Sequence, residues 1–308
     1  MSVPLYPRLE KAFKQAYLVP LTILRYGTAR PNRARLHGCD NWIYIDANDP
    51  CAIKKVVQEP LRGKVSANLI FWREFNAHLQ PELIVDVGLN YGECLFGTNY
   101  APNTKLFGFE ANPRLIPHLE QSRQHHPDGT RMTITNCLVS DAPAENVPFL
   151  VNPEWSGSSS AVREMNETHK HIEFKLPART IDSVIPAGAA EGKTLLFKMD
   201  IEGYESRALA GFVGTLGRVK QAFGFIEFTP KFMKWAGVEP EVYFGWLQER
   251  FDIYCYANAK RRELMRIQEY RELPVRHGDE FAGTDLLLAP KQPPAQWLPL
   301  DWRVVIAR

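Results

Sequence analysis

The sequence has 308 residues, of which 45% are hydrophobic and 23% are charged. These proportions are ordinary for a globular protein and exclude a disordered or fibrous chain. The formal net charge is only +2, too small for a whole-molecule field that would attract nucleic acid. No apolar stretch is long enough to cross a bilayer, and the N-terminus lacks the basic-then-apolar order of a signal peptide.

The five cysteines are widely spaced, and none forms a CxxC pair. Their odd number and their spacing suggest neither a disulfide framework nor a zinc site. We therefore expect a soluble protein in the reducing cytoplasm.

Residues 1–82 are predicted to form an N-terminal extension that acts as a lid. Segment 12–26 mixes apolar side chains with lysine and arginine, so it could lie peripherally on a membrane surface. Because Pro20 interrupts this pattern, a helix packed on the domain or on a second subunit is the favoured interpretation. Segment 41–50 alternates as a short strand would, and 54–79 predicts a helix broken near its proline and glycine.

Residues 83–290 are predicted to form one α/β domain. Short apolar runs alternate there with helix-length stretches, which is the pattern of a mostly parallel sheet buried on both faces. We expect a Rossmann-like sheet of seven strands, at 83–88, 105–110, 132–139, 194–200, 221–228, 251–257 and 284–290.

Between the third and fourth predicted strands, alternation and turn residues replace the helix spacing, which predicts an inserted β-hairpin over the active site. Its turn places Trp155 beside Ser158 and Ser159, an aromatic and hydroxyl surface suited to a carbohydrate. A solvated hairpin tip is the alternative. His169 and His171 could supply a base, although surface histidines are the commoner case.

The tail, residues 291–308, is rich in proline and is predicted to run across the surface without regular structure.

The turn after the first predicted strand carries Asp86, Gly88, Asn90 and Gly92. Glycine permits close backbone approach and positive φ, and asparagine is a common occupant of the left-handed region. A nucleoside ligand could therefore lie against bare backbone at the carboxyl ends of the strands. A tight connection between a strand and a helix would explain the same glycines.

Two acids follow the next two predicted strands. Glu110 lies 24 residues after Asp86, where an acid can accept hydrogen bonds from both ribose hydroxyls. Asp141 follows the third strand, where it could meet an adenine edge. Each acid could instead cap a helix or form a turn.

The spacing D-x-G-x-N-x-G also discriminates between cofactors. A dinucleotide fingerprint needs G-x-G-x-x-G around a pyrophosphate. If Asp86 enters the site, its charge disfavours a pyrophosphate and favours a cationic sulfonium. An oxidoreductase with a nicotinamide cofactor is the competing interpretation, and a capping role for Asp86 is a further one.

Three segments occur in an informative order: LIVDVGLNYG (83–92), RTIDSVI (179–185) and LLFKMDIEGYE (195–205). With them the chain resembles the FkbM family of S-adenosylmethionine-dependent methyltransferases. The resemblance covers about residues 42–290. It implies a seven-stranded class I methyltransferase fold and O-methylation of a sugar or natural-product hydroxyl.

When the motifs are matched residue by residue, the resemblance implies a role for each candidate site residue. Glu110 would bind the ribose, and Asp200 and Glu202 would be the active-site acids. The sequence departs from the family at Glu93 and Cys94, where small or hydroxyl residues are expected. The methionine side of the cofactor would be held by Asp86, Gly88, Asn90 and Gly92.

Methyl transfer to oxygen needs a group that removes the hydroxyl proton. On the fourth predicted strand, the period of two places Lys198 and Asp200 on one face, and either Asp200 or Glu202 could be the base. A lysine inside an apolar strand requires a partner, and Asp200 or Glu227 would serve. Lys198 could form only this ion pair or could orient the substrate and tune a base, and Glu227 is the next candidate for the catalytic acid. Asp200, Glu202 and Glu227 could alternatively chelate Mg²⁺, although we expect no metal.

The expected reaction is therefore O-methylation of a sugar or glycan hydroxyl by in-line transfer from S-adenosylmethionine. A small natural-product hydroxyl or a nitrogen acceptor is the alternative within enzymes. A catalytically silent binding protein of the same fold is the alternative outside them. A homo-oligomer is compatible with each interpretation.

Overall fold

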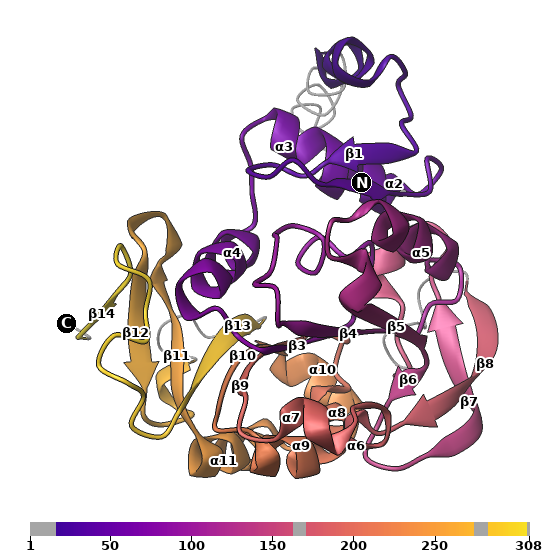
Figure 1. Ribbon diagram of the computed structural model, residues 1–308. Helices are drawn as coiled ribbons and strands as arrows, with labels where there is room; N and C mark the ends of the chain where they lie inside the picture. Colours follow the sequence, from indigo (N-terminus) through magenta and orange to yellow (C-terminus); the bar gives the residue numbers. More distant parts are fainter. Residues whose placement is uncertain (1–16, 163–170, 274–282, 307–308) are drawn as a thin grey trace, which may run out of the picture.

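The computed structural model describes residues 17–162, 171–273 and 283–306. A nine-stranded, mostly parallel sheet forms its centre (Figure 1), in the order β14-β12-β11-β13-β10-β9-β3-β4-β5. The five strands from β5 to β10 run parallel, and β13 is antiparallel to both of its neighbours. The strands are β3 (Leu83–Val87), β4 (Lys105–Glu110), β5 (Met132–Asn136), β9 (Thr194–Met199), β10 (Gln221–Phe228), β11 (Phe251–Asn258), β12 (Glu263–Ile267), β13 (Thr284–Pro290) and β14 (Arg303–Val305).

All seven predicted runs contribute a strand to this sheet, but the predicted count of seven is two too low. The additional β12 pairs antiparallel with β11 after a turn in which Arg262 has φ +54°. The additional β14 comes from the tail, where Arg303 follows the last proline and can pair with β12. Prolines prevent regular structure only where they occur, so the last residues of the tail are free to form a strand.

The third predicted run divides at Cys137. Its first half is β5, whereas its second half, β6 (Leu138–Val139), joins a separate three-stranded sheet. There β6 pairs with β8 (Ile172–Arg179), which pairs antiparallel with β7 (Ala144–Val151). The predicted hairpin is therefore part of a small sheet beside β5 (Figure 1).

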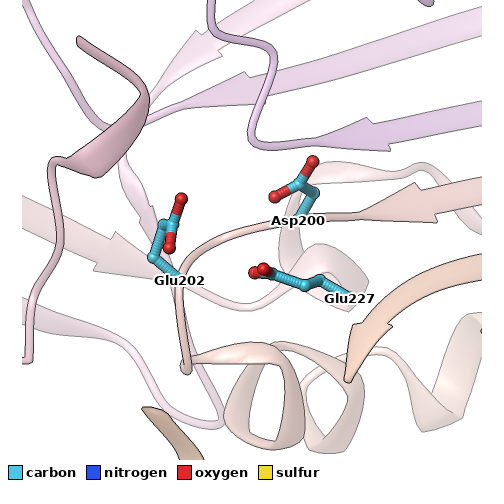
Figure 2. Close-up of side chains that lie close together, drawn as sticks. All are labelled: Asp200, Glu202 and Glu227. Carbon is cyan, nitrogen blue, oxygen red and sulfur yellow. The ribbon is translucent and has the colours of Figure 1, made fainter. Parts of the chain in front are cut away.

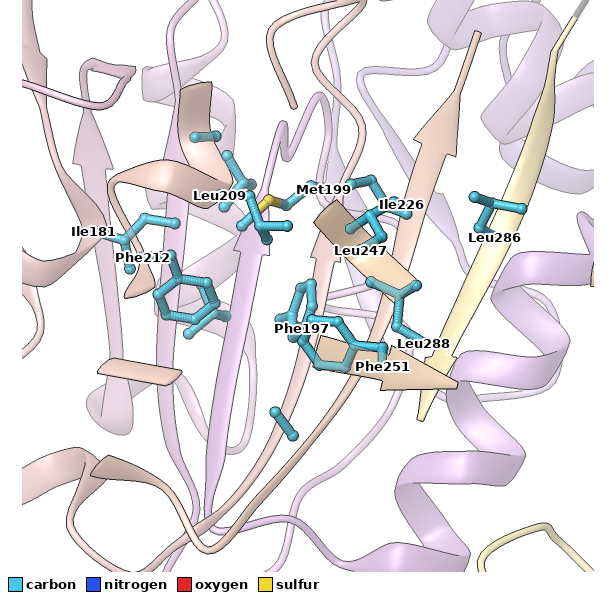
Figure 3. Close-up of a cluster of buried hydrophobic side chains, with 14 of the residues drawn as sticks. Ile181, Phe197, Met199, Leu209, Phe212, Ile226, Leu247, Phe251, Leu286 and Leu288 are labelled. Carbon is cyan, nitrogen blue, oxygen red and sulfur yellow. The ribbon is translucent and has the colours of Figure 1, made fainter. Parts of the chain in front are cut away.

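Each face of the central sheet has its own hydrophobic core, because neighbouring strand residues point to opposite faces. Phe197 and Met199 pack on one face against Leu209, Phe212 and Leu247 (Figure 3), whereas side chains of the alternate set pack on the other. The first face is covered by α8 (Glu205–Ala210), α9 (Val213–Arg218) and α11 (Pro240–Arg250). The second is covered by α4 (Ala67–Leu79) and α5 (Ile116–His125).

The N-terminal extension contains the predicted strand and the predicted broken helix. The strand is β2 (Trp42–Tyr44), which pairs with β1 (Arg33–Arg35). The helical segment runs as α2 (Pro50–Ala52), η1 (Ile53–Gln58) and α3 (Glu59–Leu61) and breaks before α4, where Gly63 has φ +69°. The remaining short helices are η2 (Gly129–Arg131), η3 (Ser156–Ser158), α6 (Ile181–Val184), α7 (Ala187–Ala190), α10 (Pro230–Trp235) and η5 (Ala259–Arg261).

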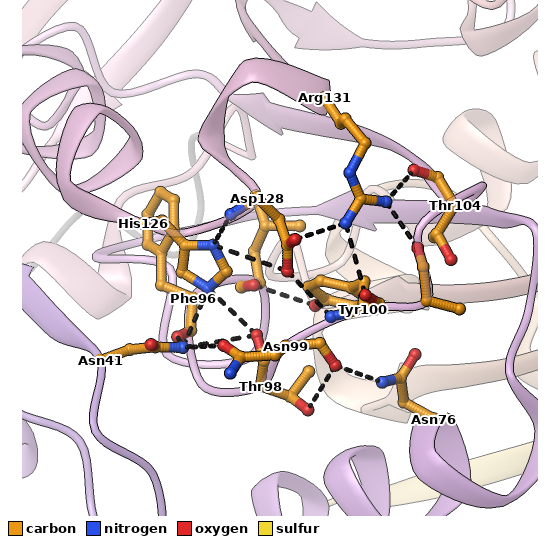
Figure 4. A network of polar contacts seen from close by, with 12 residues as sticks. Asn41, Asn76, Phe96, Thr98, Asn99, Tyr100, Thr104, His126, Asp128 and Arg131 are labelled. Atoms are coloured by element: carbon orange, nitrogen blue, oxygen red, sulfur yellow. Dashed lines mark hydrogen bonds and ion pairs between the residues drawn. The ribbon is translucent and has the colours of Figure 1, made fainter.

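A buried polar network joins the extension to the domain (Figure 4). The Asn41 amide donates to the carbonyl of Phe96 at 3.0 Å and to the side chain of Asn99 at 2.9 Å. His126 lies against the same amide, and burial lowers the pKa of its imidazole. These contacts fix the extension on the loop between β3 and β4 and on the end of α5. Within the part of the chain that is described, no helix is both long and apolar enough to cross a membrane.

Candidate active site

A pocket opens at the carboxyl ends of β3, β4 and β9, where ligands bind in open α/β sheets. The ends of β3 and β4 form one side, the loop after β9 forms a second, and the insertion covers the pocket. Its lining includes Gly88, Asn90, Phe109, Glu110, Leu138, Val139, Phe149, Ser156, Gly157, Ser159, Asp200 and Glu202.

The turn after β3 has the backbone that its sequence predicts. Gly88, Asn90 and Gly92 have φ of +82°, +50° and +80°. The two glycines also allow close packing within the protein. A Cβ on Gly88 would lie 2.0 Å from the carbonyl oxygen of Asp200, and one on Gly92 would lie 2.5 Å from the Phe96 ring. Both glycines are therefore required by the fold, and Gly92 is not among the residues that line the pocket.

Glu110 joins the end of β4 to this turn. One carboxylate oxygen accepts from the backbone N–H of Asn90 and the other from that of Asn112, each at 2.7 Å. Burial raises the pKa of Glu110 to about 7, although the two amide donors oppose the shift. Because each oxygen keeps a second lone pair, the carboxylate can still accept a hydrogen bond from a ligand in the pocket.

Asp86 lies beneath the pocket rather than in its lining. Its side chain is buried, and one oxygen is 3.8 Å from the Lys198 ammonium on the neighbouring strand. Burial raises the pKa of Asp86 to about 6, and the lysine opposes the shift. Asp86, which the sequence predicts at the methionine side of the cofactor, lies next to Lys198 because β3 and β9 place the two residues in register.

Lys198 bridges two acids at the end of β9. Its ammonium is 3.3 Å from Asp200 and donates to the carbonyl of Gly88 at 3.3 Å. Burial would lower the lysine pKa, but the carboxylates of Asp200 and Asp86 raise it overall. The predicted pairing with Asp200 is present, and Asp86 takes the place expected for Glu227.

The loop after β9 has an unusual backbone that a buried acid stabilises. Glu202 has φ +56°, although it carries a side chain, and Gly203 has φ +97°. Glu205 accepts hydrogen bonds from the N–H groups of Ile201 and Gly203 at 2.9 and 3.3 Å. This carboxylate therefore holds the loop that presents Asp200 and Glu202, a role that the sequence motif alone did not reveal.

Asp200, Glu202 and Glu227 point toward one another (Figure 2). One carboxylate oxygen of each lies within 4.8 Å of those of the other two. Burial, and then the charge of Asp200, raises the pKa of Glu202 to about 8 and that of Glu227 to about 10. Thr229 donates to Glu227 at 3.1 Å. Asp200 and Glu202 line the pocket, whereas Glu227 is not among its lining residues.

The insertion reaches the turn after β3 through a residue that sequence reasoning missed. Ser156 donates to the Asn90 side chain at 3.1 Å and lines the pocket with Ser159. Trp155 instead stacks on Lys54, with the ammonium 5.0 Å from the ring centroid, and Ser158 bonds to Asn152.

Asp141 lies outside the pocket lining. It is exposed, accepts from Ser140 at 2.9 Å and lies 3.8 Å from Arg207. Its turn follows β6, which has left the central sheet. Of the two candidate histidines, His171 does not line the pocket, and His169 lies outside the described residues.

Comparison with known proteins identifies a family domain. The model of the FkbM methyltransferase domain matches residues 86–271. No curated protein matches. A solved FkbM methyltransferase from Methylobacillus flagellatus is similar with a TM-score of 0.37 and 15% identity, over 68% of this chain and 44% of that one. The O-methyltransferase TomG from Streptomyces achromogenes, solved with SAM, has a TM-score of 0.40 and 11% identity over 79% of this chain and 90% of its own.

Proposed function

This chain belongs to the FkbM methyltransferase family, and we propose that it transfers the methyl group of S-adenosylmethionine to a hydroxyl of a sugar or glycan. One observation carries the proposal. A single pocket is lined by the Glu110 carboxylate at one end and by Asp200 and Glu202 at the other. A nucleoside and a reacting hydroxyl can therefore be held by different groups within one pocket.

The pocket residues fit the proposed cofactor. Glu110 would accept hydrogen bonds from the ribose, and the apolar side chains of Phe109, Leu138 and Val139 suit an adenine. The backbone at Gly88 and Asn90 would contact the methionine portion. Bound S-adenosylmethionine supplies an electrophilic methyl group on a positively charged sulfur. With Asp86 beneath the pocket, the negative charge that would favour this cation comes from the Asp200 carboxylate, because the raised pKa of Glu202 leaves that carboxyl mostly protonated at neutral pH.

Asp200 or Glu202 would accept the proton of the acceptor hydroxyl on a carboxylate oxygen. Both line the pocket, and the pKa of Glu202, about 8, is near the pH at which a general base works best. Lys198 would orient Asp200 through their 3.3 Å contact. Glu227, with a pKa of about 10, holds a proton at neutral pH and would keep the acids at a fixed separation.

Residues of the insertion would contact the acceptor of the methyl group. Ser159 and Ser156 offer hydroxyl groups above the pocket, which supports a polyhydroxylated acceptor such as a sugar. Trp155 is engaged with Lys54, so we assign the proposed sugar contacts to the serines. A small natural-product hydroxyl or a nitrogen acceptor would use the same pocket.

The test combines cofactor binding with acceptor screening. Calorimetric titration with S-adenosylmethionine should give saturable binding, and methyl-labelled cofactor should label a member of a panel of glycans and lipid-linked sugars. Labelling of only non-sugar hydroxyls or amines would assign the alternative acceptors. Cofactor binding without transfer to any acceptor would favour a silent binding protein, and no cofactor binding would refute the methyl-transfer proposal.

A Mg²⁺-assisted reaction is the second candidate, because Asp200, Glu202 and Glu227 lie within 4.8 Å of one another. Oxygen ligands in such a cluster suit Mg²⁺, which could also hold the acceptor hydroxyl. Calorimetry with Mg²⁺ would distinguish the candidates: binding that Glu227→Gln weakens supports the metal, and transfer unaffected by chelator excludes it.

A further inference from the structure

The helix over residues 17–26 exposes apolar side chains on most of its surface. It lies at the end of the N-terminal extension that is farthest from the central sheet (Figure 1). Leu24 is 84% exposed, and four further apolar side chains are 38–46% exposed: Tyr17, Val19, Leu21 and Ile23. At 100° per residue these positions point in several directions, so the domain could not cover them with one packed face.

Basic charge is concentrated in the same part of the chain. Residues 17–64 contain eight Lys and Arg but four Asp and Glu, a net charge of 8 − 4 = +4. The whole chain carries +2, so the remaining residues carry 2 − 4 = −2. The exposed cations of this segment are Arg25, Arg30, Arg33, Lys54, Lys55, Arg62 and Lys64.

A groove connects the helix to part of this charge. Arg25 lines it together with Arg35, His37 and the α3 residue Leu61. Arg35 pairs with Asp40, which also lines the groove, while Arg25 adds positive charge beside the apolar helix. The exposed Arg62 directly follows Leu61 in the chain.

We propose that the helix over residues 17–26, with its flanking basic residues, docks on an anionic phospholipid surface. Apolar side chains that enter the headgroup boundary and cations that attract anionic lipid are the two signals that together give stable peripheral binding. A second copy of the chain would present the same basic charge and repel it, whereas phosphate headgroups complement it. The inference does not depend on the methyl-transfer reaction.

Co-sedimentation of the full chain with vesicles tests the proposal. The protein should sediment with phosphatidylcholine vesicles that contain phosphatidylglycerol, and much less with phosphatidylcholine alone. Added salt should weaken the binding. Leu24→Glu should reduce the partition coefficient by about tenfold or more, since it removes an apolar side chain that would enter the lipid and adds repulsion from the anionic headgroups. Val242→Glu is the matched control, because Val242 is 72% exposed on α11, and should bind as the wild type does.

Thermal melting and cofactor titration of Leu24→Glu should match the wild type, which would show that the fold is intact. Equal vesicle binding by Leu24→Glu and the wild type would overturn the proposal, as would failure of the wild type to sediment with anionic vesicles. Analytical ultracentrifugation tests the alternative that a second copy of the chain docks on the helix. A dimer that Leu24→Glu dissociates, without vesicle binding by the wild type, would assign the helix to a second copy instead.

Discussion

The Glu110 carboxylate accepts a hydrogen bond from the backbone N–H of Asn90 at 2.7 Å, which ties the end of β4 to the turn after β3. Asn90 has φ +50°, so the hydrogen bond stabilises a backbone that asparagine adopts at some cost. The residue proposed to bind the ribose thus also holds the turn proposed to bind the methionine portion.

Glu110→Gln is therefore expected to weaken cofactor binding and destabilise the fold together. A glutamine amide would turn an N–H toward one of two backbone donors, leaving that donor unpaired at a cost of about 1–3 kcal/mol. We expect the Kd for S-adenosylmethionine, measured by calorimetry, to rise about tenfold or more. Asp141→Asn is the control, because Asp141 lies outside the pocket and its substitution should leave Kd unchanged. A higher Kd in that control would restore Asp141 to the cofactor site.

Gly88→Ala should be among the most destabilising single substitutions in the domain. The new Cβ would lie 2.0 Å from the Asp200 carbonyl oxygen, and the residue has φ +82°. Gly192→Ala separates the steric clash from the cost of positive φ, since Gly192 has φ +67° but a Cβ there meets nothing within 4 Å. By urea unfolding, we expect the free energy of unfolding to fall by about 1 kcal/mol in Gly192→Ala and by more than about 3 kcal/mol in Gly88→Ala. Equal losses would show that the β3–β9 contact relaxes easily.

The sequence predicts seven of the nine strands of the central sheet and part of the pocket lining, because apolar runs and the acids that follow them are local features. It does not predict where the acids point. The strand register places Asp86 next to Lys198. Asp141 lies away from the pocket because the chain leaves the central sheet at Cys137. Likewise, Glu205 belongs to the motif at 195–205, but the spacing of that motif does not predict that its carboxylate accepts hydrogen bonds from the loop after β9.

Stability should decrease as pH rises through the titration of Glu205. Burial raises the pKa of Glu205 from its ordinary value of 4.5 to about 7, so between these values the folded state binds more protons than the unfolded state. The associated stabilisation is present below about pH 4.5 and is lost as pH rises through about 7.

Glu205→Gln removes this titration while keeping an oxygen that can accept from Ile201 and Gly203. Urea unfolding at several pH values should show that the free energy of unfolding of this variant depends less on pH than that of the wild type. The variant should also be more stable than the wild type above pH 7. Glu249→Gln, at a side chain that is 72% exposed, should retain the wild-type dependence. An unchanged slope in Glu205→Gln would mean that Glu205 titrates normally.

The choice between Asp200 and Glu202 as base can be made from pH–rate profiles with any acceptor that the labelling experiment identifies. If Glu202 is the base, its carboxyl must lose a proton, so kcat should rise with pH through about 8. Glu202→Gln should then lower kcat about a hundredfold and abolish this inflection, while the Kd for the cofactor changes little. Asp200→Asn should also lower kcat by about a hundredfold if Asp200 orients or deprotonates the acceptor. In this variant an inflection will remain only if Glu202 is the base, and it should move to lower pH because the charge of Asp200 no longer raises the pKa of Glu202. Loss of the inflection in Asp200→Asn alone, with near-normal turnover in Glu202→Gln, would assign the proton to Asp200.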